Sequence, residues 1–102
     1  MNKVNICGVP YKIAEVDEIP SDIRGELVQG QIIYHEGKIY LRKSLPDKLK
    51  QSVLYHEWVH GMLVMIGRND LSDNEELVCN IANAIFGSFD FKGGKNGSRT
   101  NN

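Results

Sequence analysis

Two histidines and a glutamate lie in the middle of an otherwise apolar stretch. Residues 53–67 read VLYHEWVHGMLVMIG, and the strongly polar side chains among them are His56, Glu57 and His60. At 100° per residue, two histidines four positions apart share one face of a helix. An unpartnered imidazole or carboxylate is costly in apolar surroundings. A partner that satisfies all three groups is therefore expected.

A divalent metal ion is such a partner. His56 and His60 can both direct a ring nitrogen at one zinc ion, at about 2.0–2.1 Å. Glu57, one step round the helix, would reach a zinc-bound water and act on it as general base. HEWVH thus matches H-E-x-x-H, whose mechanics are those of zinc peptidases, and we expect one Zn²⁺ per chain. The alternative is a pair of core histidines hydrogen-bonded to backbone or tyrosine, but no Lys or Arg is available to Glu57 between positions 51 and 67.

A catalytic zinc ion takes three protein ligands and keeps a fourth position open. No histidine follows His60, and the extended metzincin motif is excluded because its positions hold Leu63 and Ile66. A downstream third ligand must then be a carboxylate or a thiolate. The candidates are Asp70, Asp73, Glu75, Glu76, Cys79 and Asp90.

The second predicted helix carries one stripe without large apolar side chains. Its members are Glu76, Asn80, Asn83 and Gly87. This stripe is the solvent face in the simplest interpretation. If the two helices instead pack antiparallel, Glu76 would point at the histidines, and the two asparagines would form hydrogen bonds around the site. Glu75 is expected to complete a capping box with Ser72. Glu76 is therefore the predicted third ligand, with Glu75 and Cys79 as alternatives.

Further residues could serve the same chemistry. Tyr34, Tyr40 and Tyr55 are candidates to stabilise a tetrahedral oxyanion, although most tyrosines simply pack. The strand around Lys38–Lys43 directly precedes the motif helix and, at a sheet edge, would bind an extended peptide by strand addition. Gly61 is expected to permit the close approach of a neighbouring element.

The elements that position these residues follow from local patterns. VNICGVPYKIAEV predicts a hairpin or bent strand around a Gly-Val-Pro turn, and QIIYHEGKIYLRKSL predicts two strands around Glu36-Gly37. A short helical turn is expected over residues 22–25. The motif helix should begin near a Ser44/Asp47 cap and run to about Ile66, where Gly67 ends it.

The second helix should start at Ser72 and fray towards Asp90. The fold class is therefore α+β: N-terminal antiparallel β-hairpins forming a sheet, followed by two packed helices, the first carrying H-E-x-x-H.

Composition limits the remaining options. With 102 residues, the chain is predicted to form one domain over residues 1–91, followed by a disordered polar tail over residues 92–102. A net charge of −1 argues against nucleic acid or an anionic membrane as partner. No secretory signal is recognisable, so Cys7 and Cys79 are expected to be free thiols in the cytoplasm.

The segment LYHEWVHGMLVMIG, preceded by GQIIYHEGKIYLRKSLP and followed by NEELVCNIANAIF, resembles the compact ImmA/IrrE-like and SprT-like metallopeptidases of phages and mobile elements. The resemblance covers roughly residues 20–90. It implies a minimal zincin core, with His56 and His60 as zinc ligands, a downstream acid as third ligand and Glu57 as general base.

Two departures from these families concern the third ligand. In ImmA/IrrE relatives the ligand glutamate lies three residues before an Ala-Asn pair, and here Ala82-Asn83 places Cys79 at that position. The resemblance therefore implies either Glu76, one turn earlier, or the Cys79 thiolate. SprT-like proteins would offer a third histidine, which this chain lacks.

The predicted function is a zinc-dependent metalloendopeptidase of the gluzincin type, with a protein or peptide as substrate. A first alternative is a zinc-binding but catalytically inactive interaction or regulatory module of a mobile element. A fourth protein ligand closing the zinc site, such as Cys79, would favour that alternative. A second alternative is a structural domain without a metal.

Overall fold

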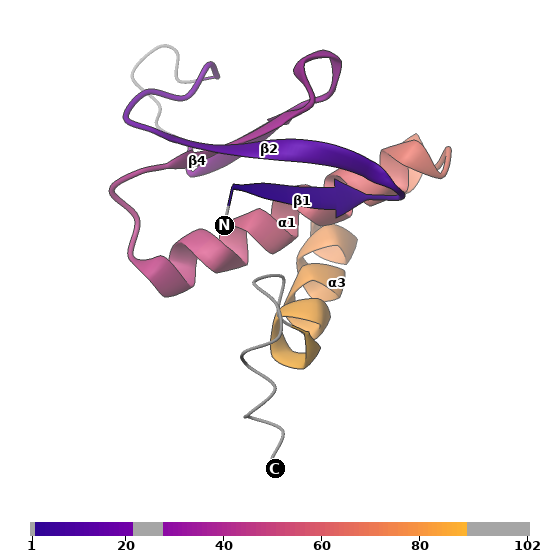
Figure 1. The fold of residues 1–102 in the computed structure, drawn as a ribbon. Helices are drawn as coiled ribbons and strands as arrows, with labels where there is room; N and C mark the ends of the chain where they lie inside the picture. Colours follow the sequence, from indigo (N-terminus) through magenta and orange to yellow (C-terminus); the bar gives the residue numbers. More distant parts are fainter. Residues whose placement is uncertain (1, 22–27, 90–102) are drawn as a thin grey trace.

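The computed structural model describes residues 2–21 and 28–89 of the chain. Its four strands are Lys3–Ile6 (β1), Val9–Val16 (β2), Gly30–Ile33 (β3) and Lys38–Arg42 (β4), with a 3₁₀ turn at Tyr34–Glu36. Its helices are Asp47–Met65 (α1), Asn69–Ser72 (α2) and Glu75–Ser88 (α3). The sheet forms one layer, α1 runs beneath it, and α3 packs on the side of α1 away from the sheet (Figure 1). This arrangement confirms the α+β prediction, with the sheet first and the motif on the first long helix.

Three predictions concern residues outside the described ranges. They are the helical turn at 22–25, the tail at 92–102 and the end of the last helix at Asp90. Among the helices of residues 2–21 and 28–89, none combines the length and the apolarity needed to cross a membrane.

The first hairpin turns at Cys7-Gly8. Both residues have positive φ, 50° and 85°, as the type I′ turn of a two-residue hairpin requires. The turn thus lies one residue before the predicted Gly-Val-Pro, because Val9 and Pro10 already pair with β1. Glycine at the second turn position adopts the left-handed conformation without strain.

The sheet is mixed rather than purely antiparallel. The strand order is β1-β2-β4-β3. Each hairpin is antiparallel, as predicted, but β2 and β4 join the two hairpins in parallel. Strand addition at Lys38–Lys43 was expected on the condition that this strand forms the sheet edge. The condition is not met, since β4 is an interior strand and β3 is the edge on its side.

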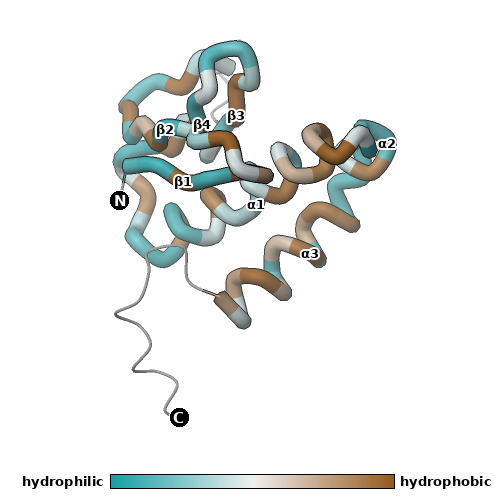
Figure 2. The backbone as a smooth tube through the Cα atoms, turned by 45° about the vertical axis from the view of Figure 1, so that its right-hand side comes forward, coloured by the Kyte–Doolittle hydropathy of each residue, from teal (hydrophilic) through white to brown (hydrophobic). Residues whose placement is uncertain are grey.

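Helix α1 separates two apolar cores. The core against the sheet consists of Ile6, Tyr11, Ile39, Leu41, Val53 and Leu54, and the core against α3 consists of Tyr55, Val59, Leu63, Val78 and Ala82. Figure 2 shows the apolar residues along both helices and the hydrophilic corner at α2. The indole N–H of Trp58 donates to the Asn5 carbonyl at 2.8 Å and ties α1 to β1. These contacts hold α1 on both sides, so the side chains between them are positioned by a rigid element.

Gly61 brings α1 close to the sheet. A Cβ at this position would lie 2.8 Å from Ile6 Cδ1 and 2.9 Å from Ile32 Cδ1. Contacts this short do not fit ordinary packing. Glycine therefore lets α1 approach the sheet this closely, as the sequence predicted, and a Cβ would have to displace the ends of the Ile6 and Ile32 side chains.

The ends of α1 differ in how well the sequence indicated them. Pro46 is the N-cap, with φ −59° and ψ 152°, and no side chain caps the first turn. The Ser44 cap is therefore a wrong prediction, because Ser44 lies too far before the first helical residue. Gly67, with φ 84°, follows the C-cap Ile66 and ends the helix as expected.

Candidate metal centre

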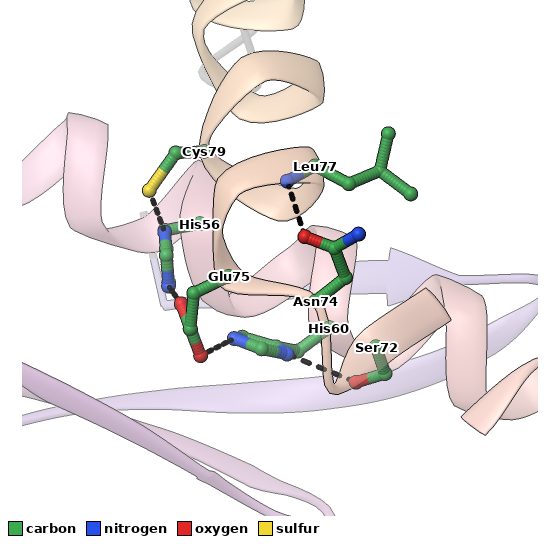
Figure 3. A network of polar contacts seen from close by, with 7 residues as sticks. All are labelled: His56, His60, Ser72, Asn74, Glu75, Leu77 and Cys79. Carbon is green, nitrogen blue, oxygen red and sulfur yellow. Dashed lines mark hydrogen bonds and ion pairs between the residues drawn. The ribbon is translucent and has the colours of Figure 1, made fainter. Parts of the chain in front are cut away.

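The two histidines of the motif face one carboxylate. His56 Nε2 lies 3.2 Å from Glu75 Oε1, and His60 Nε2 lies 3.1 Å from Glu75 Oε2. Figure 3 shows the carboxylate between the two rings, at the point where the start of α3 meets α1. The histidine side chains are 26% and 16% exposed. The Glu75 side chain is 66% exposed, so the three donor groups from two helices converge at a point that is open to solvent on the Glu75 side.

Glu75 reaches the histidines because α3 begins later than predicted. Asn74 is the N-cap, and its side chain accepts the Leu77 N–H at 3.1 Å. The predicted capping box of Ser72 and Glu75 is therefore wrong, since Ser72 ends the separate short helix α2. Glu75 is the first residue of α3 and has no capping task, so its carboxylate can turn towards α1.

The predicted third ligand, Glu76, is exposed and does not join the cluster. The other members of its stripe, Asn80, Asn83 and Gly87, are exposed as well, so the stripe is the solvent face. The side of α3 that packs on α1 carries Val78 and Ala82, which are 0% and 4% exposed. Glu75 precedes them by three and seven residues, the helical spacing of one face. That periodicity was the sequence signal for Glu75.

Each histidine has a second partner on the other ring nitrogen. His60 Nδ1 lies 2.9 Å from Ser72 Oγ, and His56 Nδ1 lies 3.8 Å from Cys79 Sγ. When Nδ1 donates its proton to such a partner, Nε2 keeps its lone pair for an ion. Ser72, a buried residue that the sequence pattern indicated only as a cap, therefore orients His60. Cys79 contacts the side of His56 opposite to Glu75, so it lies outside the donor set.

The donor set fits a zinc ion. The ligand atoms of His56, His60 and Glu75 all lie within 4.8 Å of one another. Two ligands of a tetrahedral zinc ion at its usual bond lengths are about 3.3–3.4 Å apart. The observed nitrogen–oxygen separations, 3.2 Å from His56 to Glu75 Oε1 and 3.1 Å from His60 to Glu75 Oε2, are close to that value, with each histidine facing a different oxygen. Within residues 2–21 and 28–89, no fourth His, Cys, Asp or Glu joins this cluster.

Glu57 lies beside the cluster and faces β3. Its carboxylate accepts a hydrogen bond from the Ile32 N–H. Burial, and next the negative charge of Glu75, raise the pKa of Glu57 to about 7 against the opposing effect of that hydrogen bond. A carboxylate with such a pKa exchanges its proton near neutral pH, as a general base must.

His56 is favoured in its neutral form. Burial and then the neighbouring His60 lower the pKa of His56, while Glu75 opposes both. The neutral imidazole is the form that binds a metal ion. The electrostatic environment of the motif helix thus suits a ligand at His56 and a base at Glu57.

The three candidate tyrosines have different surroundings. Tyr55 is 1% exposed, and its hydroxyl donates to the Phe89 carbonyl at 3.0 Å. Tyr40 donates to Glu36 Oε1 at 2.7 Å on the surface. Burial, and next the negative charge of Glu57, raise the pKa of Tyr34 to about 12. Tyr34 is 41% exposed, and of the three tyrosines it is the one whose pKa is raised by the charge of Glu57.

Comparison of the chain with family models, with curated proteins and with solved structures found no match. The resemblance to ImmA/IrrE-like and SprT-like peptidases thus depends on the motifs quoted above. The function of the site must be inferred from its own geometry.

Proposed function

We propose that this protein is a zinc-dependent metalloendopeptidase of the gluzincin type, related to the ImmA/IrrE-like peptidases. The observation that carries the proposal is the Glu75 carboxylate, 3.2 and 3.1 Å from the Nε2 atoms of His56 and His60. Two imidazoles and one carboxylate form the ligand set of a gluzincin-type zinc site. One zinc ion per chain would be held by these three residues.

The chemistry is divided between the ion and Glu57. A bound zinc ion supplies a Lewis acid that polarises a carbonyl and lowers the pKa of water towards about 7. Glu57 takes the proton of the attacking water and delivers it to the leaving amine. The Ile32 N–H orients the Glu57 carboxylate for both transfers. The Tyr34 hydroxyl is the candidate donor to the oxyanion.

The edge strand β3 supports a peptide as substrate. Arg42 N–H donates to the Gln29 carbonyl at 3.0 Å, and Gly30 pairs with Leu41 in the adjacent register position. Backbone groups alternate in direction along an antiparallel pair, so those of Gly30 and Ile32 point away from β4. The Ile32 N–H accordingly bonds to Glu57. An extended peptide added along β3 would lie beside the general base.

A zinc-binding but inactive module is the alternative function. A shell closed by a fourth protein ligand would favour it, and Cys79 is the candidate for that position. Cys79 Sγ instead contacts Nδ1 of His56, and the cluster of described residues has three members. An open coordination position favours the enzyme. The free, exposed thiols of Cys7 and Cys79 support the proposal that the protein works in the cytoplasm.

The Glu57→Gln variant tests the mechanism. It should bind one zinc ion per chain, measured by elemental analysis, and hydrolyse fluorescein-labelled casein at least about 100-fold more slowly, because general-base catalysis contributes that much or more. Glu76→Gln is the matched control and should keep both zinc and activity.

Three results would contradict the proposal. Casein hydrolysis by Glu57→Gln at the wild-type rate would exclude Glu57 as the base. A wild-type protein that takes up no zinc would exclude the metal site. A protein that binds zinc and cleaves nothing would favour the inactive module.

A further inference from the structure

Three lysines form a row across one face of the sheet. Lys3 pairs with Lys12 between β1 and β2, and Lys12 pairs with Lys38 between β2 and β4. Their neighbours in the chain, such as Tyr11 and Ile39, are buried in the core against α1. Since side chains alternate between the two faces of a strand, the three lysines point away from α1. This lysine row thus gathers three positive charges from three strands on the outer face.

The lysine row is open to the outside. Among the described residues, α1 lies against the opposite face of the sheet, and α3 packs on the far side of α1 (Figure 1). Lys3 and Lys12 are exposed, and Lys38 is partly exposed. Within residues 2–21 and 28–89, no carboxylate forms an ion pair with any of the three. The row therefore has no counterion in the described part of the chain.

The arrangement of the row is unfavourable for the chain alone. Like charges directly opposite each other on neighbouring strands are destabilising, and Lys12 meets such a charge on both sides, at Lys3 and at Lys38. Arg42, on the same face of β4, differs, because its guanidinium donates to the Val28 carbonyl at 2.9 and 2.7 Å. A row of like charges without a counterion points to an anionic partner.

The spacing of the row fits an acidic helix. Neighbouring strands lie about 4.8 Å apart, so the row spans about 9.6 Å. Helix positions i, i+4 and i+7 share one face and span about 10.5 Å. A helix lying across the strands would therefore place one carboxylate opposite each lysine. Ala14 and Tyr40, which pair beside the row on the same face, are partly exposed and offer an apolar contact to that helix.

A nucleic acid or an anionic membrane fits the row less well. Both carry negative charge over an area much larger than three side chains. The chain has a net charge of −1, so its field beyond the row does not attract a long polyanion. Near the row, Glu36 accepts a hydrogen bond from the Tyr40 hydroxyl at 2.7 Å and adds a negative charge on that side. A short acidic stripe is therefore the better match.

We propose that the lysine row is a docking site for a helix of a partner protein that carries acidic residues at positions i, i+4 and i+7. The proposal is independent of the proposed function, because the row contains no residue of the metal centre and lies on the face of the sheet away from α1. It assigns a binding partner that the metal centre does not require.

Two alanine-based helical peptides of identical composition provide the test. One carries glutamates at i, i+4 and i+7, and the other carries the same glutamates spread around the helix. NMR titration of the isotope-labelled full chain at low salt measures both affinities. The striped peptide should bind at least about 5-fold more tightly, because it alone engages all three lysines at once. Added salt should weaken its binding, since the lysines are exposed.

Two double variants locate the effect in the row. Lys3→Gln/Lys12→Gln removes two of its charges and should weaken the striped peptide about 10-fold. Lys43→Gln/Lys48→Gln is the matched control, because it removes two exposed lysines outside the row and changes the net charge equally. It should leave the affinity within about 2-fold of the wild type.

Several results would overturn the docking site and leave the proposed function intact. Equal binding of the two peptides, equal losses in the two double variants or no binding at low salt would each do so. A single-stranded oligonucleotide that binds more tightly than the striped peptide, and loses affinity in Lys3→Gln/Lys12→Gln, would assign the face to nucleic acid instead. In urea, Lys12→Gln should unfold at the wild-type midpoint or above it. A lower midpoint would show that the row serves the fold.

Discussion

Helix α1 has two sides that meet very different environments. Towards the sheet it packs on apolar side chains, and Gly61 lets the two layers approach until even a Cβ would lie 2.8 Å from Ile6. Towards the start of α3 it presents His56 and His60 to the Glu75 carboxylate. The positions concerned, 60 and 61, are neighbours in the chain.

The difference indicates a division of labour within one helix. Apolar burial stabilises the fold, whereas Glu57, with its pKa raised to about 7, is a carboxylate whose ionised form the fold disfavours. The apolar side therefore contributes stability. Glu57, which is next to the histidines in the chain but faces β3, is retained at a cost in the free energy of folding. A bound cation would offset that cost.

The largest expected effect tests which glutamate joins the two histidines. Glu75→Gln should lower the zinc affinity by more than about 100-fold, because it removes an anionic donor. Loss of a group that only orients a ligand lowers the affinity by at most about 100-fold. Glu76→Gln should change the affinity little, since an exposed carboxylate contributes little. Competition with a chromophoric chelator measures both. Equal losses in the two variants would contradict the assignment of Glu75.

The cost of retaining Glu57 should depend on pH. Burial raises the pKa of Glu57 from 4.5 to about 7, so the folded chain holds this proton after the unfolded chain has released it. Glu57 therefore makes its full contribution to the free energy of unfolding below pH 4.5, where it is protonated in both states. This contribution is lost as the pH rises through 7 and the folded chain releases the proton. In the metal-free protein, Glu57→Gln should therefore raise the free energy of unfolding by up to about 3 kcal/mol more at pH 8 than at pH 4.5.

Urea denaturation in the presence of EDTA at the two pH values measures this difference. Because the variant and the wild type share every other titrating group, their difference reports the titration of Glu57 together with its coupling to Glu75. A difference that is the same at both pH values would show that the Glu57 carboxylate is not penalised in the fold.

The packing of α1 against the sheet is tested most directly by a substitution at Gly61. Gly61→Val places a branched side chain against Ile6 and Ile32 and should destabilise the protein by about 2–3 kcal/mol. Gly87→Ala is the matched control, because a Cβ there meets nothing within 4 Å. It should stabilise α3 by up to about 1 kcal/mol through helix propensity. Urea unfolding of a Gly61→Val protein with wild-type stability would show that the close approach is not required.

The smallest expected effect concerns the two residues that contact the Nδ1 atoms of the histidines, Ser72 and Cys79. Ser72→Ala removes the partner of His60 Nδ1 at 2.9 Å and should lower the zinc affinity about 10-fold. Cys79→Ala should have less effect, since its contact with His56 is 3.8 Å long. Ser72→Thr keeps the hydroxyl and should restore the affinity in the same chelator titration. Wild-type affinity in Ser72→Ala would exclude the orienting role.

Local patterns predicted much of the fold. The α+β order, the two hairpins, the motif helix with its end at Gly67 and the need for glycine at position 61 all agree with the structure. The elements depend on residues close together in the chain, such as a glycine that accepts positive φ or an apolar run with a helical period. The glycine at position 61 was recognisable by its type, although the side chains that it accommodates, Ile6 and Ile32, are distant in the chain. The joining of the hairpins through a parallel pair has no such local signal.

The third donor shows how a small local error propagates. A helix start placed at Ser72 gives Glu75 a capping task and leaves Glu76 as the acid nearest the histidines. Asn74 is the cap instead. Since each helical residue turns by about 100°, a choice between two adjacent acids decides which carboxylate reaches the partner helix.

By itself, the sequence determined that His56, Glu57 and His60 lie together on a helix, because helical geometry places residues four apart on one face. Only the tertiary structure decided that Glu75 meets the two histidines, that Ser72 holds one of them and that β3 is the edge beside Glu57. Those contacts join separate elements, and their geometry follows from how α1 packs against both the sheet and α3.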